Sequence, residues 1–427
     1  MKSIKSAMRI ALLPILLFLS QQVHSQMVNN GAEITIQTGA VVYTAASFTN
    51  TSAGIVSNNG EIITGADLIN NAGASLSGNG AYSVQTNFTN NGTYTYNNSV
   101  LNFFGTGNSN LKNTGGTIYK LQVNKDSGYF INLLDNERVL KAVAFLKDNN
   151  WIRLNSKTFT MGQNCVIQNF NNKRFFITNG TGVLKKMNVK NTPFIFPVGF
   201  NKSTYNQITI TENGTPDAYS VRCRDSALLN GSSGLSVSSG GIKAAWVINE
   251  AVAGGANAVI EAQWKKPADE LPNFDYTKCM PVRYVSNHWD YQANKAGTAT
   301  GTTYRSISRS GLTAFGDFTV LSTASPSFTS SHFEAPEALS TAANNNRQIR
   351  IYPTIVQNNF NIEVPADKSI QKMNVQVIDA TGKIAWQKQN ADFISQRVLL
   401  PSLTSGTYIV LIGYGEIKFT QKIIISR

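Results

Sequence analysis

The sequence predicts an all-β protein, in which an N-terminal parallel β-solenoid is followed by a middle antiparallel β-sandwich and a small C-terminal β-sandwich. Asn, Thr, Ser and Gly are abundant, and only 14% of the 427 residues are charged. The pair Asn-Gly recurs along the chain and suits tight turns, because both residues accept a positive φ. No long stretch has the 3.6-residue periodicity of a helix. An internal repeat of twenty residues indicates the solenoid.

Residues 1–25 are expected to be a secretory signal peptide. Three cationic residues precede an apolar run at 10–19, and small residues occupy positions 23 and 25. The apolar run is too short to span a bilayer comfortably, and a retained membrane anchor is the less favoured reading. We therefore expect cleavage between Ser25 and Gln26 and export of the remaining chain.

The repeat of twenty begins after the signal peptide, and we extend the solenoid over residues 26–186. Each coil cannot bury its own apolar side, so stacked coils would pair strand on strand about 4.8 Å apart. The aligned columns are Val28, Phe48, Leu68 and Phe88; Asn30, Asn50, Asn70 and Asn90; and Ile36, Val56, Leu76 and Tyr96. The apolar columns predict continuous inner ridges. The Asn column is compatible with a ladder of amide hydrogen bonds or with corners of positive φ.

Longer alternating strands predict an antiparallel β-sandwich over residues 187–325. Its tryptophans, Trp246, Trp264 and Trp289, are expected in the core, the alternative being a carbohydrate-stacking platform. Residues 326–346 are rich in Ser, Thr, Ala and Pro, which predicts a flexible linker.

The chain has three cysteines, and an exported protein meets a compartment in which disulfides form. Cys223 and Cys279 lie in one predicted domain and are the expected pair, with Cys165 as a buried thiol. Three free buried thiols are the alternative. Their spacing fits no zinc motif.

The formal charge of +13 is spread along the chain. Removing the three cations of the signal peptide leaves +10, and residues 347–427 hold ten cations and five carboxylates, so +5 remains for residues 26–346. That charge is too dilute for a nucleic-acid interface. Attraction to anionic glycans or lipopolysaccharide and ordinary solubility explain it equally well.

Residues 347–427 contain short motifs in a specific order. These are Tyr352-Pro353, the turn Asp379-x-x-Gly382-Lys383, the pair Gly406-x-Tyr408, and a closing strand around Lys422. In this combination the segment resembles a type A C-terminal sorting domain of the type IX secretion system, the Por secretion tail of the Bacteroidota. It departs from the usual Pro-Asn-Pro, which is here Pro353-Thr354-Ile355.

The resemblance implies a small β-sandwich that acts as a sorting signal. It implies an outer-membrane translocon and a sortase-like protease as partners, removal of the tail, and joining of the cargo to anionic lipopolysaccharide. We expect Asp379 and Gly382 in a hairpin turn and Gly406 at a bend before a buried strand. The closing strand is expected to be an unpaired edge that the export machinery meets.

No catalytic constellation is present in the sequence. Only four charged residues occur between Gln26 and Tyr119, and the histidines after the signal peptide are His288 and His332. There is no nucleophile motif, zinc motif or phosphate loop. We therefore expect a structural or adhesin-like protein, secreted or on the outer face of the outer membrane, without enzymatic activity or cofactor. The alternative is a glycan-binding module or a polysaccharide-active enzyme that uses the middle domain.

Overall fold

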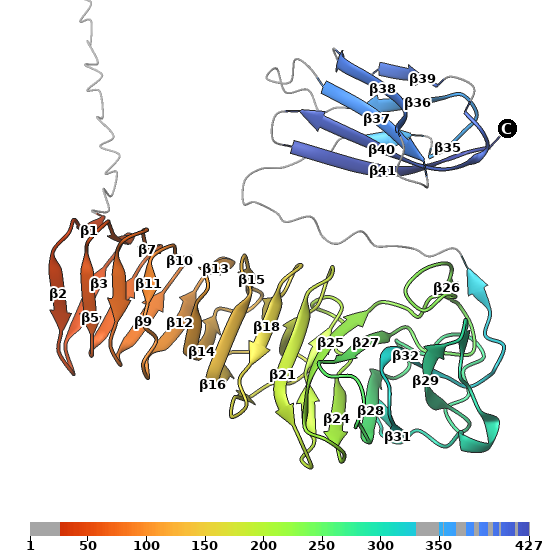
Figure 1. The fold of residues 1–427 in the computed structure, drawn as a ribbon, viewed down its shortest axis with the longest axis horizontal. Helices are drawn as coiled ribbons and strands as arrows, with labels where there is room; N and C mark the ends of the chain where they lie inside the picture. Colours follow the sequence, from red (N-terminus) through yellow and green to blue (C-terminus); the bar gives the residue numbers. More distant parts are fainter. Residues whose placement is uncertain are drawn as a thin grey trace, which may run out of the picture. The chain divides into compact units, whose positions relative to one another are not determined.

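The structure is a computed structural model that describes residues 26–329, 350–352, 354–363, 373–379, 384–391, 396–400, 403–414 and 417–426. The predicted signal peptide, Pro353, Gly382, Lys383 and most of the predicted linker lie outside these residues. The chain divides into two compact units, residues 1–337 and 338–427. In the described residues the single helical element is the 3₁₀ turn η1 (Ala293–Lys295). The all-β class and the N-terminal solenoid are confirmed (Figure 1).

The first four rungs of the solenoid each contribute one strand to three parallel sheets, which we call faces A, B and C (Figure 1). Face A begins with β1 (Met27–Asn29), β4 (Phe48–Asn50), β7 (Leu68–Asn70) and β10 (Phe88–Asn90). Face B is β2 (Glu33–Ile36), β5 (Ile55–Asn58), β8 (Ser75–Ser77) and β11 (Thr93–Tyr94). Face C begins with β3 (Val41–Thr44), β6 (Glu61–Thr64), β9 (Ala81–Val84) and β12 (Val100–Gly105).

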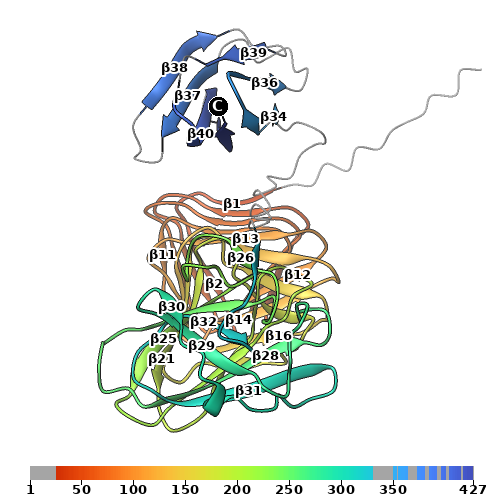
Figure 2. The ribbon, with the colours of Figure 1, turned by 90° about the vertical axis from the view of Figure 1, so that its right-hand side faces the viewer.

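Later rungs keep faces A and C, whereas face B ends at β11. Face A continues through β13 (Ser109–Asn113), β15 (Phe130–Leu133), β17 (Asn150–Arg153), β20 (Arg174–Ile177) and β23 (Val198–Gly199). Face C continues through β14 (Thr117–Lys125), β16 (Glu137–Phe145), β18 (Thr158–Met161) and β21 (Val183–Val189), and β19 (Val166–Gln168) also pairs with β16. Figure 2 looks along the stack of rungs.

The predicted apolar ridge is confirmed for Phe48, Leu68 and Phe88, which are register partners and fully buried. The first rung was predicted one residue out of register: Met27, and not Val28, is the partner of Phe48. A shift of one residue turns a side chain to the other side of the sheet, and Val28 is accordingly 51% exposed.

The other predicted apolar column is correct for Val56 and Leu76 only. Ile34 and Tyr94 are their partners in the neighbouring rungs, each two residues before the predicted Ile36 and Tyr96. Rung length varies along the chain, since 20 residues separate Leu68 from Phe88 and 23 separate Phe88 from Leu111. A fixed period of twenty therefore holds between Phe48 and Phe88 on face A and fails in the first rung and beyond Phe88.

The asparagine column forms a buried ladder of side-chain amides. Each Nδ2 donates to the Oδ1 of the next rung, at 2.9 Å from Asn29 to Asn50, 2.9 Å from Asn50 to Asn70, 2.7 Å from Asn70 to Asn90 and 2.9 Å from Asn90 to Asn113. None of these asparagines has a positive φ. Of the two predicted roles the ladder is correct, and in the first rung its member is Asn29 and not Asn30.

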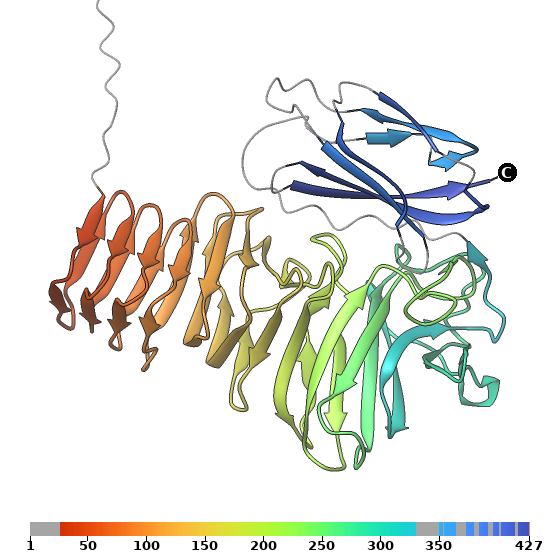
Figure 3. The same ribbon diagram turned by 45° about the horizontal axis from the view of Figure 1, so that its top comes forward.

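The middle region continues face C with antiparallel strands, and Figure 3 shows the stacked rungs passing into these longer strands. The change of direction occurs where β21 pairs with β25, close to the predicted boundary at residue 186. After β25 (Asp217–Arg224) the sheet contains β27 (Ala245–Glu250), β32 (Gly316–Leu321), β29 (Met280–Val285) and β30 (His288–Trp289). One hydrophobic core extends from Ile36 in the solenoid to Val320 in this region.

The middle region also contains a second, separate antiparallel sheet. It contains β22 (Phe194–Phe196), β24 (Ile208–Glu212), β28 (Ala258–Lys265) and β31 (Tyr304–Leu312). The short strands β26 (Ser236–Val237) and β33 (Phe328–Thr329) pair with each other. Residues 328–329, near the start of the predicted linker, are thus strand.

The C-terminal unit has its own core and two sheets. The smaller sheet contains β34 (Arg350–Tyr352), β36 (Asn359–Glu363) and β39 (Gln396–Leu399). The larger sheet has the order β35 (Ile355–Val356), β41 (Ile417–Ile425), β40 (Gly406–Tyr414), β37 (Met373–Asp379) and β38 (Ile384–Ala391). Side chains from both sheets form one buried cluster, separate from the core of the first unit.

Candidate functional site

The closing strand β41 is the centre of the candidate signal. It pairs antiparallel with β40 over its whole length, from Gly406 opposite Ile425 to Tyr414 opposite Ile417. Successive side chains of β41 point to opposite sides of the sheet. Ile423 and Ile425 are buried in the core, whereas Lys422 points to the other side and is exposed. The strand is thus anchored by apolar side chains on one side and presents a cation on the other.

The second edge of β41 is partly covered, which corrects the expectation of an unpaired edge. β35 pairs parallel with its C-terminal end, with Ile355 opposite Ile424 and Val356 opposite Ile425. The Ile424 N–H donates to the Thr354 carbonyl at 2.7 Å, and the Ser426 N–H donates to the Val356 carbonyl at 2.9 Å. Thr354 and Ile355, the residues that depart from the usual Pro-Asn-Pro, are therefore part of this contact.

The motif residues on β37 and β40 are register neighbours. Asp379 ends β37 opposite Tyr408 of β40, and β37 and β38 pair as a hairpin around the predicted turn. Tyr408 is buried, and its hydroxyl donates to the Thr404 carbonyl at 3.0 Å. This bond fixes the ring over the segment that leads into β40.

Gly406 opens β40 without the left-handed backbone that would require glycine. A Cβ at this position would lie 3.7 Å from the Tyr408 ring, an ordinary contact distance. The expected bend therefore does not depend on glycine sterics. Four motif residues, Asp379, Gly406, Tyr408 and Lys422, lie in one sheet, whereas Tyr352 belongs to the smaller sheet.

Residues 350–426 match the model of the family described as the secretion system C-terminal sorting domain. The chain ends in a type IX sorting domain. The sorting domain indicates a cargo protein that the type IX secretion system exports. None of the curated proteins compared with the chain matches it.

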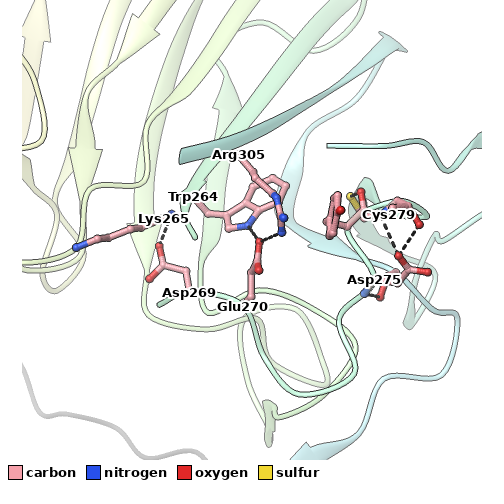
Figure 4. Close-up of polar contacts among 10 residues, drawn as sticks. Trp264, Lys265, Asp269, Glu270, Asp275, Cys279 and Arg305 are labelled. Atoms are coloured by element: carbon pink, nitrogen blue, oxygen red, sulfur yellow. Dashed lines mark hydrogen bonds and ion pairs between the residues drawn. The ribbon is translucent and has the colours of Figure 1, made fainter. Parts of the chain in front are cut away.

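The middle region contains the polar cluster drawn in Figure 4, a second candidate site. Trp264 is fully buried, and its Nε1 donates to Glu270 Oε1 at 3.1 Å. Arg305 Nη1 donates to the same oxygen at 2.5 Å, and its guanidinium lies 3.5 Å from the centre of the Tyr276 ring. These groups satisfy one another and hold the core together.

The neighbouring carboxyl in Figure 4 is also satisfied inside the fold. Asp269 Oδ2 accepts the Lys265 N–H and the Asn206 Nδ2–H, each at 2.8 Å. Burial raises the pKa of Asp269 above its usual range. The first bond links β28 to the segment that follows it, and the second links that segment to Asn206, just before β24, which is a structural role.

The three tryptophans considered for glycan stacking are buried. Trp246 and Trp264 are 0% exposed and Trp289 is 8% exposed. Stacking on a sugar requires an exposed ring face, so these residues provide no platform. The expected core role is the one that the structure supports.

The expected disulfide between Cys223 and Cys279 is not formed in the structure, where Cys165, Cys223 and Cys279 are free and buried. Each of the expected partners donates locally, Cys223 to the Arg224 carbonyl at 3.7 Å and Cys279 to the Tyr276 carbonyl at 3.4 Å. Burial raises the pKa of the Cys165 and Cys279 thiols to about 12. A thiol that stays protonated is a poor nucleophile.

Two buried charged residues of the solenoid were missed by the sequence analysis. Lys125 is fully buried, and its ammonium donates to the carbonyls of Gln85, Phe104 and Thr106 at 2.6, 2.6 and 3.2 Å. Burial lowers the pKa of Lys125 to about 8. Glu137 accepts the last Nδ2–H of the asparagine ladder, from Asn113 at 3.4 Å, and burial raises the pKa of Glu137 to about 9.

The described residues contain no group of three or more His, Cys, Asp and Glu side chains placed to hold a metal ion. Within the same part of the chain, no helix has the length and hydrophobicity that would suit a membrane span.

Proposed function

We propose that this chain is a secreted or surface-located structural protein with an adhesin-like role. The sorting domain at 350–426 carries the proposal, because it indicates export. The solenoid supports a structural role: its apolar side chains form one continuous core, and its rungs are joined by the asparagine ladder. A long rigid body of this kind presents an extended polar surface.

The export route defines the proposed partners. Residues 1–25 would be removed between Ser25 and Gln26, and the outer-membrane translocon would then bind the domain at 347–427. A sortase-like protease would cut within the linker at 326–346 and join the cargo to anionic lipopolysaccharide or release it. Within the sorting domain we propose a signal formed by Tyr352, Pro353, Asp379, Gly382, Lys383, Gly406, Tyr408 and Lys422.

The adhesive role is tested in the native bacterium with a gene deletion and an epitope-tagged full chain. We expect the tag on intact cells or in the medium, and weaker cell–cell or cell–surface attachment in the deletion strain. Normal attachment and normal envelope integrity in that strain would rule out the structural and adhesive role. The export function would then be judged separately from the location of the tag.

A further inference from the structure

The later rungs of the solenoid carry a positive charge that the whole-chain average conceals. Residues 26–111 contain three carboxylates and no Lys or Arg. Residues 112–202 contain fourteen Lys or Arg against four Asp or Glu, a balance of +10, and residues 203–329 contain ten of each. Counting the charge in separate segments would have revealed this band from the sequence.

Part of this charge lies along one row of face C. The register pairs Thr117 with Arg138, Arg138 with Thr160, Thr160 with Lys185 and Lys185 with Ser220. These five residues, which we call the cationic row, cross β14, β16, β18, β21 and β25, neighbouring strands in Figure 1. Hydroxyl and cationic side chains therefore alternate across the sheet.

The cationic row points away from the core. The residue beside each of its solenoid members is buried, namely Ile118, Val139, Phe159 and Leu184. Successive side chains of a strand point to opposite sides, so the row lies on the outer side of face C. Arg138 is exposed, and the other four residues of the row are half-buried. With one strand between them, Arg138 and Lys185 are about 10 Å apart.

No described carboxylate forms an ion pair with Arg138 or Lys185. The aspartates of these rungs are engaged elsewhere: Asp126 pairs with Lys147 at 2.8 Å, Asp148 pairs with Arg174 at 2.9 Å, and Asp135 accepts the Thr114 hydroxyl at 3.3 Å. Glu137 is buried, and its raised pKa keeps it protonated at neutral pH. Two more cations, Lys120 and the exposed Lys141, lie on β14 and β16.

We propose that the cationic row binds an anionic polysaccharide that lies across the strands of face C. The two cations of the row, Arg138 and Lys185, would displace counter-ions of a linear polyanion, which favours binding at low salt. The Arg138 guanidinium matches a carboxylate or sulfate with two parallel hydrogen bonds. The hydroxyls of Thr117, Thr160 and Ser220 can both donate to and accept from sugar hydroxyls.

The composition of the row favours a polysaccharide over a nucleic acid. Single strands bind by stacking bases on aromatic rings, and duplex DNA is read by an element that enters a groove. The cationic row contains no aromatic residue and lies on a sheet face. The proposal is independent of the export signal, because polysaccharide binding by the cationic row can be measured with the protein in solution.

The test uses the full chain and three polymers at low ionic strength: polygalacturonate, dextran sulfate and neutral dextran. The variant Arg138→Gln/Lys185→Gln removes two charges from the row. The control Lys278→Gln/Lys295→Gln removes two exposed charges from the middle region. We expect the row variant to bind polygalacturonate and dextran sulfate about tenfold more weakly, with the control within about twofold of the unmodified chain.

Salt and DNA complete the test. The affinity of the unmodified chain should fall as NaCl rises, and the row variant should show a shallower dependence. Equal weakening in both variants, or equal binding of neutral dextran, would overturn the proposal. Tighter binding of duplex DNA than of either anionic polysaccharide would replace it with a nucleic-acid surface. Equal melting temperatures for the variants would show that affinity, and not folding, has changed.

Discussion

The side-chain amide of Asn70 forms hydrogen bonds through both its nitrogen and its oxygen. It is 0% exposed, and its Nδ2 lies within hydrogen-bond distance of Asn90 Oδ1, the Ala74 carbonyl and the Thr93 carbonyl, at 2.7, 3.3 and 3.0 Å. Its Oδ1 accepts from Asn50 at 2.9 Å. The amide is therefore needed as both donor and acceptor.

Asn70→Asp should lower the free energy of unfolding by about 3 kcal/mol or more, because a buried carboxylate would face three acceptors. Asn79→Asp is the matched control: Asn79 is exposed, and the change should stay within about 0.5 kcal/mol. Chemical denaturation measures both values. Similar losses in the two variants would contradict the energetic role of the ladder.

Glu137 makes stability depend on pH in a direction unusual for a carboxyl. Burial raises its pKa from 4.5 to about 9. Between these values the unfolded chain releases the proton that the folded chain keeps. The free energy of unfolding therefore falls as pH rises through this window.

Glu137→Gln should remove this dependence, so that its melting temperature falls less than that of the unmodified chain between pH 6 and 9. Glu33→Gln, which changes an exposed carboxyl, should leave the pH profile unchanged. Thermal melts across this range provide the measurement. A Glu137→Gln profile parallel to that of the unmodified chain would show that Glu137 is ionised in the fold.

At the scale of elements, adjacent residues of β7 have opposite environments. Leu68 lies in the inner ridge and is 0% exposed, whereas Ile69 points outward and is half-buried. Leu68→Ala should cost about 2–5 kcal/mol because it opens a cavity between Phe48 and Phe88. Ile69→Ala should cost clearly less. If Ile69→Ala proved the more damaging change in chemical denaturation, the register of the solenoid would be wrong.

The middle of the repeat was predictable because twenty residues separate each rung from the next between Phe48 and Phe88. The columns through Phe48, Leu68 and Phe88 follow directly from a period of twenty. The later rungs were not predictable from the repeat, because turns of different length change the number of residues from one rung to the next. The buried Lys125 was also hidden, because one of its partners, the Gln85 carbonyl, lies 40 residues away in sequence.

At the scale of the whole molecule, the sorting domain was the part that the sequence specified best. Each of its motifs is a short run of neighbouring residues in a fixed order, so the motifs were visible without a fold. The pairing of β35 with β41 was not, because it joins residues about seventy positions apart through a contact that no motif encodes. The charge balance was misread for a different reason: averaging over residues 26–346 hid the charge of +10 at residues 112–202.

The two units of the chain have separate hydrophobic cores, which makes export and folding separable. Deleting residues 347–427 should therefore leave a folded solenoid with an unchanged melting temperature that stays in the periplasm. Fusing residues 326–427 to an exported fluorescent protein should bring that protein to the cell surface or medium.

A fusion that ends at residue 416 is the control: it lacks β41, whose Ile423 and Ile425 fill the core of the sorting domain, and should remain inside. Cell fractionation and protease shaving of intact cells measure the location. If the truncated chain reached the surface in normal amounts, residues 347–427 would not be the signal that directs this chain outward.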